Sequence, residues 1–401
     1  MDLCYLDANA TTFMPDVVIK TMIKWVNKGN PSASYSSAEE CKNLISTFKD
    51  TILSDNHLCN FTAIFTSGAS ESNAHILISS VRSFMTKTGK LPHIIISSVE
   101  HKSILSCCED LKNDGLCQYT KINVQKSGPG YGTVDPDELD KLIKPNTCLI
   151  SIMTANNETG MINNIPALAS VAHKHNVPIH TDCVQSFGKY GVYAGIDACS
   201  ISFHKLYGPT GLGLLLIRNS FLDGYKLRPL ISGTQNNGLR GGTENIPAIA
   251  ASYAAYRYNN LKRMEKNERL LSLKMFLMGL INKYIPCYFI DEFKDQYQSK
   301  NKIFWISNRN NEKMLPNTIL LSVYKDNFCN MKVKKELEDN NIILSIGSAC
   351  NTAINRASDV IFGIGVPDIL RSGILRISLS DDTTREHIIY FATVFLKIID
   401  I

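Results

Sequence analysis

The chain has 401 residues, of which 44% are hydrophobic and 20% are charged, and its formal net charge is +5. A chain of this length can bury a large core and predicts one large domain with a smaller second one. The positive charge is spread over scattered Lys- and Asn-rich segments without a basic block, so we expect no nucleic-acid binding. No apolar run is long enough to span a bilayer, and the N-terminus MDLCYLDANATT resembles no secretory signal or transit peptide. We therefore expect a cytoplasmic protein without membrane association.

The twelve cysteines give little guidance by themselves. None of them is spaced as a CxxC pair, and a disulfide framework suits a small secreted chain rather than one of this length. We expect most of them to be reduced and buried, so a catalytic thiol must be recognised by its surroundings. No cluster of His and Cys has the spacing of a zinc site, and no metal is expected.

Strands and helices are predicted to alternate between about residues 60 and 220. Strands are expected at 63–66, 94–98, 119–124, 147–153, 178–181, 199–203 and 212–217. Helices are expected after residue 66, with Leu77, Val81 and Phe84 on one face, from an N-cap at Asp135, and over 165–175. This alternation predicts a mostly parallel sheet that is covered by helices on both faces.

The pattern changes beyond Pro247. The sequence predicts a long helical stretch over 247–284 and a surface excursion over the Asn- and Lys-rich residues 291–314. Strands at 318–323, 342–345 and 373–380, and helices over 331–340 and from 383 onward, are expected to follow. These elements predict a compact α+β unit as the smaller domain.

Polar clusters follow several of the predicted parallel strands, where the ligands of open α/β sheets bind. TSGASES at 66–72 has the small residues that let backbone N–H groups hold a phosphate, although a helix start capped by Ser70 explains it equally well. His101 can stack on a ring or move protons, or simply be a surface residue. The amides in ANNETG at 155–160 can position a ligand or form a turn.

Asp182 and Lys205 end two further strands, in HTDCVQ and SFHKLYGPTG. The carboxylate can ligate a metal or pair with a protonated ring nitrogen. A partly desolvated lysine has a lowered pKa and can act as a Schiff-base nucleophile, whereas an isolated lysine is usually a solvated surface charge. A lysine, a carboxylate, a phosphate turn and a ring-stacking histidine at one sheet edge are the groups that pyridoxal phosphate requires.

The motifs TSGASES, VEHKS, ANNETG, HTDCVQS, SFHKLYGPTG, RGGTENIP, GSAC and LRISLS occur in an order that resembles the NifS/IscS-type cysteine desulfurases. These are fold-type I pyridoxal phosphate enzymes of the class V aminotransferase branch. YLDANATT and GNPSAS are similar to the N-terminal signatures of the same family, and the resemblance extends from residue 3 to about residue 390. It implies a large domain at 14–260 with a mostly parallel seven-stranded sheet flanked by helices. It also implies a smaller α+β domain, made of 1–13 and 261–401, that carries a catalytic cysteine loop.

The resemblance also implies roles for individual residues. Lys205 matches the Schiff-base lysine, Asp182 the partner of the pyridinium nitrogen, and Gln185 the residue that hydrogen-bonds the phenolic oxygen of the cofactor. His101 matches the ring-stacking and proton-moving histidine, and Ala69, Ser70, Ser202 and His204 match ligands of the cofactor phosphate. Asn157 matches a residue that touches the cofactor and, together with Arg376, binds the substrate carboxylate. An arginine suits this task because its planar guanidinium can donate two parallel hydrogen bonds to a carboxylate.

Two further matches imply partners. Thr243 matches a residue that reaches the cofactor phosphate of the other subunit, which implies a homodimer. Cys350, in a loop of small residues, matches the cysteine that takes sulfur from L-cysteine as a persulfide. A sulfur-acceptor protein for iron–sulfur cluster assembly or thiolation would receive that sulfur, and L-alanine would be the other product.

The sequence departs from the family at several positions and leaves alternatives open. No histidine follows GNPS, Gln235–Gly238 replaces an acidic/basic pair, and 291–314 and the residues after Asn351 match poorly, all of which bears on partner docking. A selenocysteine lyase, an aminotransferase or a non-catalytic NifS-like scaffold would share much of the same pattern. Cys350 argues against an aminotransferase, which has no use for a mobile thiol, and the complete set of site residues argues against a scaffold.

Overall fold

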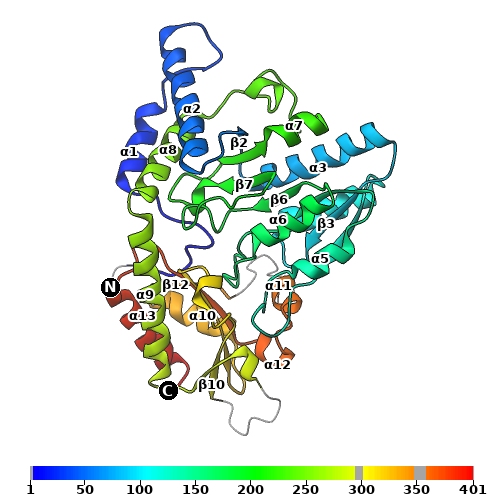
Figure 1. Ribbon diagram of the computed structural model, residues 1–401. Helices are drawn as coiled ribbons and strands as arrows, with labels where there is room; N and C mark the ends of the chain where they lie inside the picture. Colours follow the sequence, from blue (N-terminus) through cyan, green and yellow to red (C-terminus); the bar gives the residue numbers. More distant parts are fainter. Residues whose placement is uncertain (1–2, 294–300, 347–357, 401) are drawn as a thin grey trace.

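The computed structural model describes residues 3–293, 301–346 and 358–400. Figure 1 shows a larger upper part built around one sheet and a smaller lower part built around another. The upper sheet has seven strands in the order β2-β8-β7-β6-β5-β3-β4. In chain order they are β2 (Phe61–Thr66), β3 (His93–Ser97), β4 (Gln118–Ile122), β5 (Thr147–Ser151), β6 (Ile179–Asp182), β7 (Ala198–Ser202) and β8 (Gly213–Arg218).

The strand directions confirm the predicted mostly parallel α/β sheet. Every neighbouring pair from β7 through β6, β5 and β3 to β4 is parallel. Strand β8 is the exception, because it runs antiparallel to both β7 and β2. Only the loop at 203–212 joins β7 to β8, whereas a parallel neighbour requires a longer crossover connection.

Helices cover both faces of this sheet, as predicted. The alternation of side chains along β3 places Ile94 and Ile96 in one apolar core and Ile95 in another. The first core is closed by α3 (Ala69–Thr88), α4 (Lys102–Asn113) and α7 (Asn219–Tyr225). The second is closed by α2 (Ser36–Asp55), α5 (Pro136–Leu142), α6 (Ile165–Lys174) and α8 (Ile246–Asn260).

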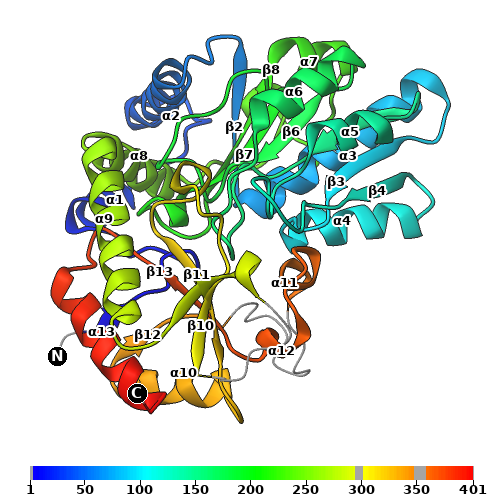
Figure 2. The ribbon, with the colours of Figure 1, turned by 60° about the horizontal axis from the view of Figure 1, so that its bottom comes forward.

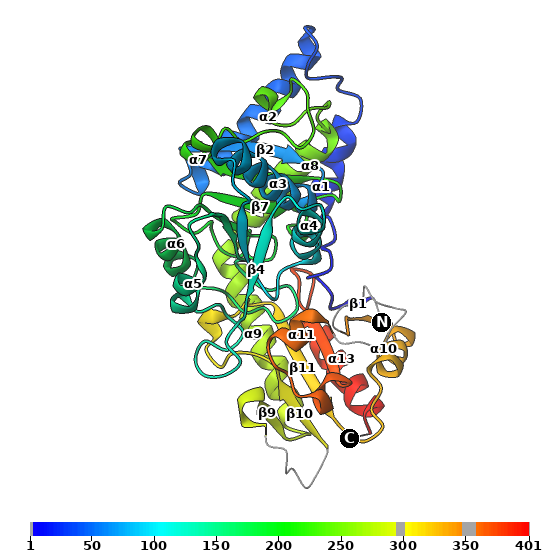
Figure 3. The same ribbon diagram turned by 90° about the vertical axis from the view of Figure 1, so that its right-hand side faces the viewer.

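The lower part is the predicted α+β unit, and Figure 3 shows it stacked beneath the upper part. Its four-stranded sheet has the order β13-β11-β10-β9. The strands are β9 (Cys287–Phe289), β10 (Lys302–Trp305), β11 (Thr318–Tyr324) and β13 (Ile374–Ser378). Its apolar core is closed by α9 (Arg263–Asn282), α10 (Asn330–Asp339) and α13 (Arg385–Ile398).

The N-terminal segment joins this lower part. Strand β1 (Cys4–Tyr5) pairs in parallel with β12 (Ile342–Ile343), and Cys4 and Leu6 are buried in the same core as α9 and α13. The remaining helices are α1 (Asp16–Trp25), α11 (Asp359–Gly363) and α12 (Asp368–Arg371), with short 3₁₀ turns at Phe203–Lys205, Asn236–Gly238, Ile290–Glu292 and Asn311–Lys313. Figure 2 shows α11 beside the upper part near α4, and Gly363 of α11 lies close to Val99.

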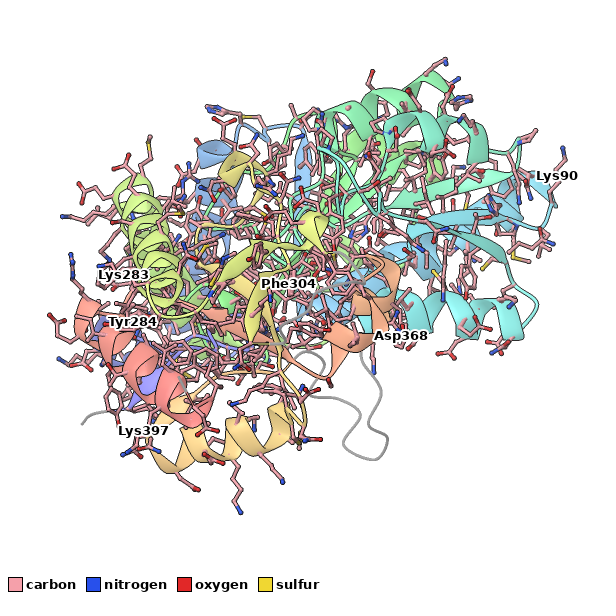
Figure 4. All side chains as sticks on the ribbon, turned by 90° about the horizontal axis from the view of Figure 1, so that it is seen from below. Lys90, Lys283, Tyr284, Phe304, Asp368 and Lys397 are labelled. Atoms are coloured by element: carbon pink, nitrogen blue, oxygen red, sulfur yellow. The ribbon has the colours of Figure 1, made fainter. Side chains whose placement is uncertain are left out.

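For the second half of the chain, one expectation is confirmed and one was wrong. The predicted helical stretch over 247–284 is present as two successive helices, because α8 ends at Asn260 and α9 begins at Arg263; Figure 1 shows them in succession down the left side. The segment 291–314 is not only a surface excursion, because it contains the inner strand β10, whose Phe304 is fully buried (Figure 4). Three apolar residues outweigh their polar surroundings there because burying them on a sheet is favourable. In the described part of the chain, no helix is both long and apolar enough to cross a membrane.

Candidate active site

A large open cavity lies at the edge of the upper sheet where the parallel strands end. Its volume is about 610 Å³, which falls within the range of small-molecule sites. Residues of the lower part, such as Arg376 and Ser358, complete its wall. Ten of the residues singled out from the sequence line this one cavity: Ala69, Ser70, His101, Asn157, Asp182, Gln185, Ser202, His204, Lys205 and Arg376.

Lys205 lies just after β7 and is largely removed from solvent. Its Nζ donates to the backbone oxygen of Asn9 at 2.7 Å and also to that of Ala10. Burial lowers the pKa of this amine to about 8, and the positive charge of Arg376 acts in the same direction. The neutral amine, which is the nucleophilic form, is therefore a much larger fraction of the population here than at a surface lysine.

Asp182 is the last residue of β6 and is only 6% exposed. Its Oδ1 accepts from the backbone N–H of Val184 at 2.9 Å, and its Oδ2 accepts from Asn73 Nδ2 at 2.9 Å. Two donors on different elements fix the direction of the carboxylate. Such a fixed carboxylate suits pairing with a protonated ring nitrogen. Among the described residues, no group of three or more His, Cys, Asp and Glu side chains is arranged to hold a metal ion.

The turn between β2 and α3 forms one end of the cavity. Helix α3 begins at Ala69 and its N-cap is Gly68, so the alternative that Ser70 caps the helix is wrong. Strand β8 passes very close to this turn, because a Cβ on Gly213 would lie 2.5 Å from the carbonyl carbon of Gly68. Because the first N–H groups of a helix have no partner within the helix, the start of α3 can offer backbone donors to an anion in the cavity.

Two residues after β7 complete this end. Ser202 is buried at the strand end, and the Nδ1 of His204 lies 3.2 Å from the Oγ1 of Thr11. Burial, together with the charge of Lys205, lowers the pKa of His204 to about 4. The ring is therefore neutral at pH 7 and acts as a hydrogen-bonding group rather than as a cation.

His101 is an exposed residue at the N-cap of α4, where its Nδ1 accepts from the backbone N–H of Ser103 at 3.1 Å. The neutral ring therefore carries its proton on Nε2. The neighbouring Glu100 is only 2% exposed, and its Oε1 accepts from the backbone N–H of Met153 at 2.7 Å. Its Oε2 has no hydrogen-bond partner among the described residues. Burial raises the pKa of Glu100 well above its usual range, and the charge of Asp182 adds to this rise.

Arg376 of β13 brings the lower part into the site. It is 7% exposed, its Nη2 donates to Asp7 Oδ1 at 2.6 Å, and its Nη1 donates to the backbone oxygen of Asn157 at 3.1 Å. Its Nε has no partner among the described residues. A buried arginine that lines a cavity and keeps a donor unused suits a carboxylate ligand.

The structure adds residues that the sequence reasoning did not select. Asp7 orients Arg376, and Asn9 offers its backbone oxygen to both Lys205 and Gln185. The motif YLDANATT was noticed only as a signature, and its position next to β13 could not be read from it. Ser358 Oγ donates to the buried carboxylate of Glu158 at 2.6 Å on the cavity wall.

Of the remaining selected residues, one lies away from the cavity and one is outside the described part of the chain. Thr243 is exposed and lies outside the cavity lining of its own chain. Cys350 lies outside the described residues, so its role as the sulfur-accepting thiol stays a prediction.

The residues present fit pyridoxal phosphate. The cavity offers an amine of lowered pKa, a fixed buried carboxylate and a helix start that packs so closely against Gly213 that no side chain fits at that position. These are the groups needed for the aldehyde, the ring nitrogen and the phosphate of that cofactor. The fold and this arrangement place the chain in the structural class of the fold-type I pyridoxal phosphate enzymes.

The chain belongs to the class-V aminotransferase family, whose sequence profile matches residues 4–391. It is 35% identical over 402 aligned residues to a cysteine desulfurase IscS of Dictyoglomus turgidum, with 99% of this chain and 94% of the relative covered. It resembles a solved NifS-like protein of Rickettsia africae with a TM-score of 0.82 and 27% identity over both whole chains. A structure described as SspA in complex with cysteine matches with a TM-score of 0.75 and 30% identity, and the match covers 94% of this chain and 98% of that one.

Proposed function

We propose that the protein is a pyridoxal phosphate-dependent cysteine desulfurase that converts L-cysteine into L-alanine and leaves a persulfide on Cys350. The observation that carries this proposal is the convergence of Lys205, Asp182 and Arg376 on one cavity from two parts of the chain. Relatives that cover almost the whole chain carry the name cysteine desulfurase, which supports the same reaction. When bound, the cofactor supplies an electron sink for the bonds at the substrate α-carbon.

Each residue has a distinct task in this proposal. Lys205 would bind the aldehyde group of the cofactor, and Asp182 would keep the ring nitrogen of the cofactor protonated. Gln185 hydrogen-bonds the phenolic oxygen, and His101 stacks on the ring, where its Nε2 can exchange a proton. Ala69, Ser70, Ser202 and His204 hold the phosphate. Arg376 binds the substrate carboxylate through the donors that Asp7 and Asn157 leave unused, and Asn157 also touches the cofactor.

The sulfur step involves the thiolate of Cys350. This thiolate forms an S–S bond with the substrate sulfur while the carbon–sulfur bond breaks. The bonding electron pair stays with the carbon, which takes up a proton and leaves as part of L-alanine. The outer sulfur remains on the enzyme as a persulfide, and an acceptor protein takes it for iron–sulfur cluster assembly or thiolation.

We also propose that the active form is a homodimer. Thr243 is exposed and away from the cavity of its own chain, which fits a contact with the cofactor phosphate of a second subunit. Apolar side chains of α1, among them Val17 and Ile23, are at least half exposed, as expected for a surface that a second copy covers. We place the protein in the cytoplasm because its described cysteines are all free thiols.

We further propose 14–260 as the large domain, and 1–13 with 261–401 as the smaller one. The pairing of β1 with β12 supports this division, because it joins the N-terminal segment to the C-terminal part.

The proposal is tested with the purified protein, L-cysteine and a thiol reductant. We expect one L-alanine for each sulfide released, loss of both visible absorbance and activity in Lys205→Ala, and loss of sulfur transfer with retained absorbance in Cys350→Ser. Full activity of Cys350→Ser would make the nucleophile assignment wrong. Turnover of selenocysteine alone, or amino transfer to a keto acid, would instead identify a selenocysteine lyase or an aminotransferase. Uptake of no cofactor would favour a non-catalytic scaffold.

A further inference from the structure

A carboxylate stands in the middle of the turn that would hold the cofactor phosphate. Glu71 lies in the first turn of α3 and lines the cavity. Its Oε2 accepts from the backbone N–H of Ser67 at 2.7 Å. Although burial opposes ionisation, the hydrogen bonds from Arg240 and Ser67 lower the pKa of Glu71, so this group is an anion at neutral pH.

A negative charge at this position would repel a phosphate dianion unless another group balances it. Arg240 balances this charge through a bidentate ion pair, in which its Nε lies 2.9 Å from Oε1 and its Nη2 lies 3.2 Å from Oε2 of Glu71. The side chains of Glu71 and Arg240 are only 9% and 20% exposed, so solvent screens this pair weakly. The ion pair therefore shapes the turn and cancels the charge that would otherwise oppose phosphate binding.

Arg240 also belongs to a segment, 231–243, that folds back on itself. The backbone N–H of Gly241 donates to Ile231 O at 2.8 Å, and that of Gly242 donates to Gln235 Oε1 at 3.0 Å. A Cβ on Gly241 would lie 2.2 Å from the backbone oxygen of Ser232, so the backbone at 232 and the backbone at 241 lie against each other. The two ends of this segment are therefore tied to each other, and Thr243 lies three residues after Arg240.

We propose that Glu71 and Arg240 are a positioning pair that joins the phosphate turn of one subunit to the segment bearing Thr243. The pair thereby couples the hold on a subunit's own phosphate to the placement of Thr243 toward the partner subunit. This inference rests on the proposed function for its cofactor and its dimer. Neither residue needs to touch the cofactor, because each acts through the backbone that it fixes.

The test measures cofactor binding to Glu71→Gln, to Arg240→Gln and to the double variant. Visible absorbance gives the cofactor dissociation constant, and inorganic phosphate gives a thermal shift of the cofactor-free protein. Arg240→Gln leaves an unpaired buried carboxylate beside the phosphate and should weaken cofactor binding about tenfold to a hundredfold. Glu71→Gln should weaken it less, by about threefold. The double variant should bind at least about threefold more tightly than Arg240→Gln, because it removes the uncompensated charge.

A matched control is available in the pair Arg218–Asp197. Its Nε–Oδ1 distance is 3.0 Å and Asp197 is buried to a similar degree, but neither residue lines the cavity. Arg218→Gln should lower the unfolding temperature without changing the cofactor or phosphate affinity. If Arg240→Gln does not fold, Arg240→Lys replaces it in the test. Lysine keeps the positive charge but cannot make the bidentate contact to Glu71, so this variant should weaken cofactor binding less than tenfold.

A separate double-mutant cycle tests the coupling of the pair to Thr243. Thr243→Ala should weaken cofactor binding in the wild-type background and have little further effect on Arg240→Gln. If the fold losses in cofactor affinity of the single variants simply multiply in either double variant, the residues act independently and the inference is overturned. An Arg240→Gln variant that binds cofactor as tightly as wild type would overturn it as well. A wild type that takes up no cofactor would refute the proposed function instead, and the phosphate shift of the variants would then decide this inference alone.

Discussion

The lowered pKa of Lys205 makes a prediction about how fast the cofactor-free protein takes up pyridoxal phosphate. Only the neutral amine attacks the cofactor aldehyde, so the rate follows the fraction of unprotonated Lys205. With a pKa of about 8, roughly one molecule in ten carries the neutral amine at pH 7. With an ordinary pKa of about 10.5 that fraction would be about one in three thousand, so burial accelerates attachment about 300-fold at pH 7.

The assay mixes cofactor-free protein with pyridoxal phosphate and follows the growth of the visible band between pH 6 and pH 10. We expect the rate to rise about ninefold from pH 6 to pH 7 and about fivefold from pH 7 to pH 8, and to level off above pH 8. Arg376→Gln removes a positive charge that helps to lower the pKa of Lys205, so the levelling should move to higher pH. Lys205→Arg is the control and should develop no covalent band.

A rate that still rises tenfold between pH 9 and pH 10 would refute this reasoning. It would mean that the amine titrates like a solvent-exposed lysine and that the cavity does not desolvate it. A flat profile would also contradict it, because attachment would then not depend on the protonation of Lys205.

Three further predictions concern other buried ionisable side chains. Lys274 is 3% exposed and its pKa is lowered by burial to about 8, so Lys274→Met should stabilise the protein at pH 7 by about 1–3 kcal/mol in urea unfolding. Between pH 8 and pH 10.5 the unfolded chain binds more protons there, so wild-type stability should gain from this residue as the pH rises, and the variant should lack that gain. Glu100→Gln should match the stability of the wild type at acid pH, where the carboxyl is protonated in both the folded and the unfolded chain. At neutral pH the variant should be more stable than the wild type, because burial raises the pKa of Glu100 and so opposes ionisation in the folded chain; a variant less stable by more than about 1 kcal/mol there would contradict this. The contribution of Glu100 is present at acid pH and falls as the pH rises above its unfolded pKa, so the variant should lose less stability toward alkaline pH. Arg376→Lys should raise the KM for L-cysteine about 10- to 100-fold while the visible band is retained, because the fork to the carboxylate is lost.

The sequence predicted the convergence of the strand-end motifs well. Ser70, Asp182 and Lys205 are far apart in the chain, but each follows a strand of one sheet, and such ends meet at the same edge. The mostly parallel sheet and its helices on both faces followed from the alternation of apolar segments for the same reason.

Other features depend on contacts that no local pattern encodes. The strand Lys302–Trp305 was missed because its polar neighbours dominate the composition, and the antiparallel direction of β8 depends on the length of a loop. The ion pairs of Arg240 with Glu71 and of Arg376 with Asp7 join residues that are 169 and 369 positions apart. Neither periodicity nor turn chemistry carries information over such distances.

The most direct test of the central claim is the absorbance spectrum of the purified protein before and after addition of L-cysteine, with L-alanine measured in the same sample. The account predicts a visible band in the resting protein, a change of that band when L-cysteine is added, and release of L-alanine. A colourless protein, or a coloured one that leaves L-cysteine unchanged, would contradict the account.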